Sequence, residues 1–423
     1  MYLKINSAMT NGLTISGSRQ KLVTEGYLIP FILVTSLFFL WGFAHSLLDV
    51  LNKHFQEILG ITKARSGWVQ AALYGGYFVM AIPAGLIMTR FGYKRGIIFG
   101  LLLYAFGAFL FMPAAQIQTF EFTLLCLFII ACGLTCLETA ANPYSTVLGP
   151  KPTSEQRLNL SQSFNGVGWI TGPAIGGLLI FGTIGEAETN KFATLTLPYM
   201  MIGTLVLLVS IMFMFTKMPD IHEGEYNSHG DRGQYRDLLK YRHFKLAVLT
   251  QFLYVAAQTG INSFFINYVT EQMPNFSNEK AAYLLSLGFV FFMVGRFSGS
   301  FMMTWFKPNM MLALYAIINV LAMVFVVLGL GWLSIIALYL TYFCMSIMFP
   351  TIFALGIKDL GGLTKKASSF IIMTIVGGAV CPIFMGWIAD ISTMATGFIV
   401  PLVCFTFIIY FGMNGYKVRS VVR

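Results

Sequence analysis

Apolar segments of about 20 residues recur along the whole sequence, and a helix needs about that length to cross the hydrocarbon core of a bilayer. The chain of 423 residues is 57% hydrophobic and only 10% charged, with a mean hydropathy of +0.74, which excludes a soluble domain of this size. We therefore predict an all-α membrane protein with twelve transmembrane helices. The expected spans are 27–51, 67–89, 96–115, 120–148, 158–181, 195–216, 245–270, 280–304, 309–330, 332–356, 367–389 and 394–415.

The basic residues alternate between the loops that join these segments. If the N-terminus lies inside, the cytoplasmic segments hold 21 of the 27 Lys and Arg residues. Such a bias predicts a multi-pass membrane protein with both termini in the cytoplasm. The net charge of +10 is therefore explained by basic residues in the cytoplasmic loops, and we expect no nucleic-acid partner. The first 25 residues show no pattern of a cleaved signal peptide.

A hydrophilic segment in the middle of the chain divides the apolar segments six and six. We predict an N-terminal tail at 1–26, a six-helix bundle at 27–216, a cytoplasmic linker at 217–244, a second bundle at 245–415 and a tail at 416–423. The linker is interpreted as solvated, with a short surface helix near Tyr235–Tyr241. Pro143 and Pro350 are each followed five residues later by Leu-Gly, which favours a duplicated architecture. Two such bundles can rock about a central cavity.

Glu138 lies deep inside the apolar segment 120–148. An ionisable side chain at membrane depth is costly unless it is paired, hydrated or protonated, so it indicates a substrate or proton site. Asn142 follows four residues later and shares its helix face, and Pro143 frees a backbone carbonyl. The sequence therefore predicts a transporter whose pathway Glu138 faces.

Two further segments carry polar stripes at helical spacing. The fifth contains Asn159, Gln162 and Asn165, and the seventh contains Gln251, Tyr254, Gln258 and Asn262. Amides donate and accept hydrogen bonds together, as sugar hydroxyls require. Hydrogen bonding between helices is the alternative role for each of these side chains.

Three aromatic side chains are candidates for the apolar face of a sugar site. They are Trp41, Trp169 and Phe349. Neutral sugars suit a mixture of amides and aromatic surfaces. Ordinary packing is the alternative for each aromatic ring.

Asp49 is the second carboxylate of interest. It lies 19 residues after Pro30, about 28 Å along a helix, which reaches either the membrane interior or the outer interface. His45 precedes it by one turn and is a candidate partner. Arg296 is the one cation inside a predicted span, and either closes the cytoplasmic side or forms a structural ion pair.

Neither an enzyme nor a metal protein is indicated. All six cysteines lie in apolar segments without metal-ligand spacing, and no Ser/His, His-Glu or paired-carboxylate arrangement shares a helix face. We therefore expect no catalytic residues, no metal and no cofactor, and a monomer whose partners are a small-molecule sugar, a proton and the lipid bilayer.

The loop from Gly85 to Arg95 resembles the loop signature of the major facilitator superfamily, although Thr89 stands where that family usually has aspartate. Within it, the chain resembles the L-fucose:proton symporters and their glucose/galactose relatives. The stretches that carry this resemblance are Phe39–Gly42, Leu137–Pro143, Arg157–Leu160, Gln162–Asn165, Phe349–Phe353 and Ser369–Ile371.

The resemblance implies a secondary symporter that imports L-fucose by alternating access, with Asp49 and Glu138 coupling proton movement to sugar binding. Family members usually carry asparagine where this chain has Leu48 and Ser46, with His45 beside them. This departure leaves a glucose/galactose symporter open, and sodium coupling is a further alternative. A membrane sugar sensor that does not transport is the alternative from another class.

Overall fold

The computed structural model describes residues 22–150, 153–181, 193–218, 235–303, 305–360 and 363–418, and all regular secondary structure within these ranges is helical. The first half of the chain forms the helices α1 (Leu28–Leu59), α2 (Lys63–Ser66), α3 (Trp68–Phe91), α4 (Tyr93–Phe109), α5 (Phe111–Ile117), α6 (Phe120–Val147), α7 (Ser154–Gly176) with the π-helical turn η2 (Gly177–Phe181), and α8 (Ala193–Phe215).

The second half repeats this pattern of long helices with short breaks. Its elements are α9 (Tyr235–Leu238), α10 (Arg242–Gln272), α11 (Asn278–Met302), α12 (Pro308–Val327), α13 (Trp332–Met345), α14 (Met348–Gly356), α15 (Thr364–Met373), η5 (Thr374–Val376), α16 (Gly377–Ile391), α17 (Met394–Gly397), α18 (Ile399–Tyr410) and η6 (Phe411–Gly415). The short α9 lies where a surface helix was predicted, whereas most of the linker lies outside the described residues.

The prediction of an all-α membrane protein is confirmed. Eleven helical segments are long and apolar enough to cross a membrane. The seventh predicted span corresponds to α10, which at 31 residues is long enough to cross a membrane but is not one of these eleven segments. Its polar side chains lie in the middle of the protein, where they contact other helices instead of lipid. Helix α1 runs eight residues past its predicted end before Gly60 adopts a left-handed backbone.

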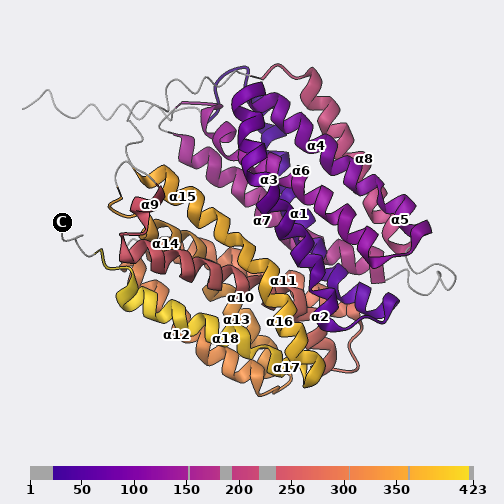
Figure 1. Ribbon diagram of the computed structural model, residues 1–423, viewed down its shortest axis with the longest axis vertical. Coiled ribbons are helices and arrows are strands. Elements are labelled where there is room, and N and C mark those ends of the chain that lie inside the picture. The colour runs from indigo at the N-terminus through magenta and orange to yellow at the C-terminus, as the bar shows by residue number, and fades with distance from the viewer. Residues whose placement is uncertain are drawn as a thin grey trace, which may run out of the picture.

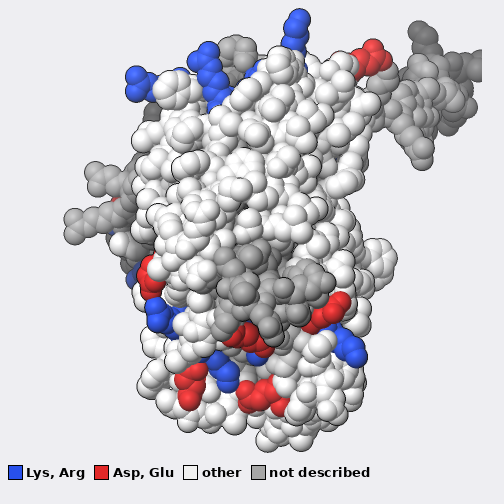
Figure 2. Space-filling model, turned by 90° about the vertical axis from the view of Figure 1, so that its right-hand side faces the viewer, with Lys and Arg blue, Asp and Glu red and all other residues white. Residues whose placement is uncertain are grey.

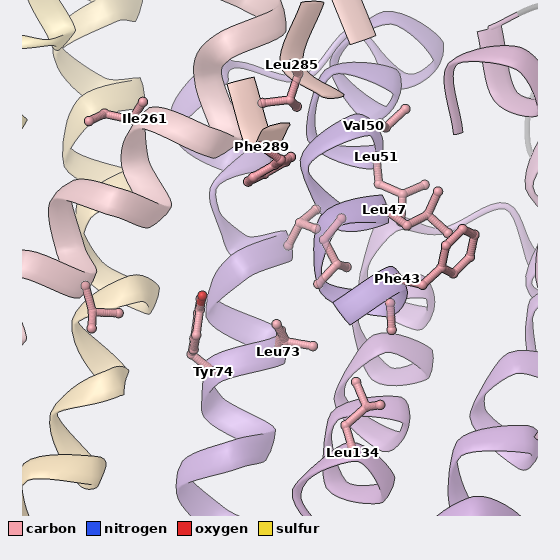
Figure 3. Packing of buried hydrophobic residues seen from close by; sticks show 14 of the residues in the cluster. Phe43, Leu47, Val50, Leu51, Leu73, Tyr74, Leu134, Ile261, Leu285 and Phe289 are labelled. Atoms are coloured by element: carbon pink, nitrogen blue, oxygen red, sulfur yellow. The ribbon is translucent and has the colours of Figure 1, made fainter. Parts of the chain in front are cut away.

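The helices form two groups that follow the order of the chain (Figure 1). In the first group α1 packs along α7, and α6 lies against α3 and α4. In the second, α10 packs against α14, α16 and α18, while α12 lies against α13 and α18. The two groups meet where α1 contacts α10, α7 contacts α11 and α16 contacts α2 and α3. Figure 3 shows apolar side chains of α1 and α3 near others on α10 and α11.

Charged side chains gather toward the two ends of the molecule. On the face in Figure 2, a wide band of uncharged surface separates one end, where most charged residues are Lys or Arg, from mixed charges toward the other. Many large hydrophobic side chains are exposed, including Phe106, Leu205 and Leu321. A broad apolar belt of this kind is what a bilayer requires. We call the two ends of the molecule the α2 end and the α9 end, after the short helices found there.

Candidate functional site

Asp49 lies at the junction of the two bundles and is 2% exposed. Its Oδ1 accepts hydrogen bonds from Gln70 Nε2 on α3, at 2.9 Å, and from Ser263 Oγ on α10, at 3.4 Å. Its Oδ2 is buried and has no hydrogen-bond partner among the described residues. Because α1 continues for about 15 Å beyond Asp49, the carboxyl group belongs to the protein interior and not to the end of the span.

His45 sits one turn earlier on α1, among aromatic rings. Its ring lies 5.3 Å from that of Tyr77, 5.7 Å from Trp169, and 6.2 Å from both Trp41 and Tyr74, between centroids. His45 Nε2 lies 2.9 Å from the Tyr77 hydroxyl, so the two share a hydrogen bond. We call His45 with these four aromatic residues the aromatic cage.

Glu138 connects this cage to the polar face of α6. It is half-buried, and the Tyr77 hydroxyl lies within hydrogen-bonding reach of its carboxyl group. One turn further along α6, Asn142 Nδ2 donates to the Glu138 carbonyl at 3.1 Å, and Asn142 Oδ1 accepts from Gln162 Nε2 on α7 at 3.2 Å. A carboxyl group and two amides thus form one continuous polar strip, which is half-buried throughout.

Tyr74 on α3 interacts electrostatically with both carboxyl groups, Asp49 and Glu138. Its hydroxyl lies 3.1 Å from Thr259 Oγ1 on α10. Figure 3 shows its hydroxyl directed away from α3, in the region between the two bundles. The structure therefore links the two predicted carboxylates through a tyrosine that also reaches the second bundle.

Several of the predicted amides have other surroundings. Asn165 Nδ2 donates to the Phe38 carbonyl at 3.1 Å, which joins α7 to α1. Asn262 is 3% exposed, with its Oδ1 unpartnered in the described part of the chain, and Gln258 is half-buried. Asn159 lies on α7, but its side chain is outside the described residues.

The remaining predicted residues belong to the second bundle. Tyr254 donates from its hydroxyl to the Met345 carbonyl at 2.9 Å, where the helix breaks between α13 and α14, and its ring lies 6.3 Å from that of Phe349. The Arg296 guanidinium lies 5.0 Å from the centre of the Phe292 ring and has electrostatic contact with Tyr254. Arg296 therefore lies beside the aromatic residues of the second bundle.

Five residues of this junction were not singled out from the sequence: Gln70, Tyr74 and Tyr77 on α3, and Thr259 and Ser263 on α10. The α3 residues are spaced four and three apart, so they share one helix face. This polar stripe on α3 is the sequence feature from which the three residues could have been predicted. The α10 pair gives no such signal, because isolated Ser and Thr residues are common in membrane helices.

In the described part of the chain, no group of three or more His, Cys, Asp or Glu side chains could hold a metal ion. The six cysteines are buried and free.

Two helical bundles with a buried carboxyl group at their junction, and a half-buried one on α6, define a membrane transporter of the alternating-access type. Residues 33–374 match the family model of the Major Facilitator Superfamily, and the chain belongs to that family. It is a transporter and not an enzyme.

Curated relatives cover nearly the whole chain. It is 41% identical to the L-fucose-proton symporter of Escherichia coli, over 92% of this chain and 93% of the relative. It is 34% identical to the glucose/galactose transporter of Brucella abortus, over 91% and 93% of the two chains.

Solved structures give the same fold. A fucose transporter in the outward conformation is 41% identical and matches with a TM-score of 0.67, over 93% of this chain and 100% of that one. A D-xylose-proton symporter matches with a TM-score of 0.72 at 12% identity, over 94% and 99% of the chains, which shows the shared fold alone.

Proposed function

We propose that this protein is a proton-coupled sugar symporter that imports L-fucose across the bacterial cytoplasmic membrane. The observation that carries the proposal is the junction itself, where two carboxyl groups, a strip of amides and an aromatic cage lie together between the bundles. The 41% identity to the E. coli L-fucose-proton symporter supports the choice of sugar and of coupling ion.

The proton is assigned to the carboxyl groups because no cation accompanies them. Neither Asp49 nor Glu138 takes part in a salt bridge in the described part of the structure. A bare carboxylate at membrane depth is costly, and a bound proton removes its charge. Tyr74 interacts electrostatically with both carboxyl groups, so the protonation state of one can influence the other.

The sugar is assigned to the region between the aromatic cage and the amide strip. Aromatic rings stack against the C–H faces of a pyranose, and the Asn142–Gln162 pair can exchange its mutual hydrogen bond for bonds to hydroxyl groups. Gln258 and Phe349 would complete the site from the second bundle. Asn165 is a positioning residue in this proposal, because its amide holds α7 against α1.

The orientation follows from the charges. The loop between α3 and α4 carries Arg90, Lys94 and Arg95 at the α9 end, which we assign to the cytoplasm. The bundles are joined at the other end, where Asp390 accepts hydrogen bonds from two backbone N–H groups of α2 and Lys63 pairs with Glu271 at 3.2 Å. With the α2 end outside, the structure is closed to the exterior.

Closure of the α2 end toward the exterior also explains the moderate TM-score with the outward-facing fucose transporter. A relative 41% identical over nearly the full chain superposes with a TM-score of 0.67, and that relative is in the outward conformation. Two bundles that keep their internal packing but differ in relative position would give such a value. We infer that the chain is seen here in an inward-facing state.

A glucose/galactose symporter is the second candidate. Relatives from Brucella abortus and Helicobacter pylori with that name are 34% and 35% identical, and His45, Ser46 and Leu48 depart from the pattern of the fucose transporters. Sodium could replace the proton as the coupling ion, and a membrane sugar sensor that does not transport is the candidate from another class. We expect a monomer with both termini in the cytoplasm.

Uptake into proteoliposomes tests the proposal. Radiolabelled L-fucose should accumulate when an inward pH gradient is imposed, and unlabelled L-fucose should suppress it better than D-glucose, D-galactose or D-mannose. Strong competition by glucose or galactose would move the chain to the hexose branch. Uptake that requires Na⁺ would contradict proton coupling, and sugar binding without uptake would identify a sensor.

A further inference from the structure

Asn52 joins the two bundles directly beside Asp49. It lies three residues after Asp49 on α1 and is fully buried. Its Nδ2 donates a hydrogen bond of 2.6 Å to the backbone carbonyl of Ser263 on α10. The same Ser263 donates from its Oγ to Asp49 Oδ1. Two side chains on one face of α1 therefore converge on one residue of the opposite bundle.

Each of these two side chains is left with one unsatisfied oxygen. Asp49 Oδ2 and Asn52 Oδ1 are both buried and lack a hydrogen-bond partner among the described residues. The orientation of the Asn52 amide is fixed, because a backbone carbonyl only accepts and so must face the NH₂ group. Two acceptors thus remain at the same junction, and buried polar atoms of this kind are normally satisfied.

A single proton satisfies both oxygens. We propose that Asn52 is part of the proton site, and that Asp49, when protonated on Oδ2, donates a hydrogen bond to Asn52 Oδ1. This inference rests on the proposed proton-coupled transport and adds a residue to it. Asn52 then accepts from the proton site with its oxygen and donates to the second bundle with its nitrogen.

The arrangement suits a proton better than a metal cation. Calcium and magnesium ions take six or more oxygen ligands, whereas Asp49 and Asn52 each offer one free buried oxygen in the described structure. Asp49 Oδ1 is already occupied by two donors. A proton needs only one donor position and one acceptor.

The other titratable groups around Asp49 do not supply that donor. Tyr74 on α3 is bonded to Thr259, and the Tyr342 hydroxyl on α13 has electrostatic contact with Asp49 but no hydrogen-bond partner in the described structure. His45 on α1 is bonded to Tyr77. Helix α10 presents only neutral side chains here, Thr259 and Ser263.

This geometry couples protonation to movement. The Asn52–Ser263 bond exists only while the bundles are closed at the α2 end. With Asp49 protonated and bonded to Asn52, the free oxygens of both side chains are paired; with Asp49 ionised, both oxygens are left without a partner among the described residues. Loss of the proton therefore favours separation of α1 from α10, which reopens the α2 end for the next cycle.

The test uses the pH dependence of transport in three variants. Initial uptake of radiolabelled L-fucose, and of D-glucose in parallel, is measured in proteoliposomes at a fixed membrane potential while the external pH is varied. Asn52→Leu should lower the apparent proton affinity about tenfold, so that half-maximal uptake moves about one pH unit toward acid. Gln70→Leu removes a hydrogen-bond donor to the ionised Asp49 carboxylate. The pH of half-maximal uptake should therefore move toward alkaline values.

Asn267→Leu is the matched control. Asn267 also lies on α10 and exchanges hydrogen bonds with Gln56 across the same end of the bundles, but it does not contact Asp49. Its replacement should leave the pH of half-maximal uptake unchanged. Sugar counterflow at acid pH, where the site is saturated, checks that each variant is folded.

Three results would overturn the inference: an Asn52→Leu profile that coincides with the wild-type profile, an equal shift in Asn267→Leu, or rescue of Asn52→Leu by Na⁺ and not by acid. A wild-type protein that shows no proton-driven uptake of either sugar would instead refute the proposed function. The wild-type measurement therefore distinguishes a failure of the Asn52 inference from a failure of the proposed proton-coupled transport.

Discussion

The hydroxyl groups of Tyr74 on α3 and Thr259 on α10 lie 3.1 Å apart and join the two bundles at the level of the two carboxyl groups. Tyr74 is buried, and its ring also faces His45 in the aromatic cage. One side chain therefore packs in the aromatic cage and also bonds to the opposite bundle. Its hydrogen bond is available only when the α2 end is closed.

Removing either hydroxyl should weaken this closed state. A buried hydrogen bond contributes about 1 kcal/mol, so Tyr74→Phe or Thr259→Val should shift the conformational equilibrium about fivefold toward the open α2 end. Spin labels on the exposed Thr62 and Ser392 would report the change as a larger population of long distances. The double variant should match the single ones, since both remove the same bond; additive effects would show that the two hydroxyls act independently.

Glu138→Gln should abolish proton-driven accumulation of sugar while sugar exchange persists. The amide keeps the shape of the side chain and its contact with Tyr77 but cannot release a proton. Uptake under a pH gradient and counterflow without one separate the two activities. Glu121→Gln is the control, because Glu121 is exposed at the start of the same helix. Full accumulation by Glu138→Gln would remove this residue from the coupling mechanism.

The close approach of α2 to α16 predicts a steric block. A methyl group on Gly386 would lie 2.5 Å from the Lys63 carbonyl carbon, too close for the two helices to keep their contact. Gly386→Val should hold the α2 end open, so that the protein binds sugar but transports it at least about tenfold more slowly. Gly85→Ala meets nothing within 4 Å and should transport normally. Normal transport by Gly386→Val would mean that this contact does not form during the cycle.

His45→Leu should raise the KM for sugar about tenfold with a smaller change in maximal rate. The substitution breaks the hydrogen bond that orients Tyr77 and takes a polar group out of the aromatic cage. His45→Gln, which can still bond to the tyrosine hydroxyl, should recover most of the affinity. Equal losses in both variants would assign His45 a packing role. The measurement is the concentration dependence of initial uptake.

The ion pair between Lys63 and Glu271 should contribute little to closure of the α2 end and to the uptake rate. Surface pairs typically contribute less than about 1 kcal/mol, so Lys63→Met should change the uptake rate by less than about fivefold. Asp390→Ala removes the acceptor for two backbone N–H groups of α2 and should have the larger effect. The reverse order would show that the ion pair, and not the anchored backbone, holds the α2 end closed.

Much of the fold could be predicted because membrane helices are determined by length and hydropathy. The predicted and observed segments agree closely, and the main discrepancy is informative. Helix α1 continues through Asn52, Lys53 and His54, a polar stretch that is typical of a loop. Each of these residues has a partner: Asn52 bonds to α10, Lys53 pairs with Glu57 on α1, and His54 packs against Phe181.

The site was only partly predictable. Asp49 and Glu138 stand out because a charge within an apolar segment is rare, whereas Gln70 and Ser263 are ordinary neutral residues. Their importance comes from contacts across the bundles, and Asp49 and Ser263 are 214 residues apart in sequence. Local patterns carry no information on such a contact. The binding role of Asn165 stays a prediction, although the structure gives its amide a helix-joining contact.

In a symporter, sugar and proton cross the membrane together, and sugar-driven proton entry measures this coupling. Proteoliposomes that contain a trapped pH-sensitive dye, with no initial pH gradient, are mixed with L-fucose, and the internal pH is followed. If proton entry is coupled to sugar entry through Glu138, the vesicle interior should acidify rapidly with the wild type and not with Glu138→Gln. Sugar entry without acidification in the wild type would contradict proton coupling.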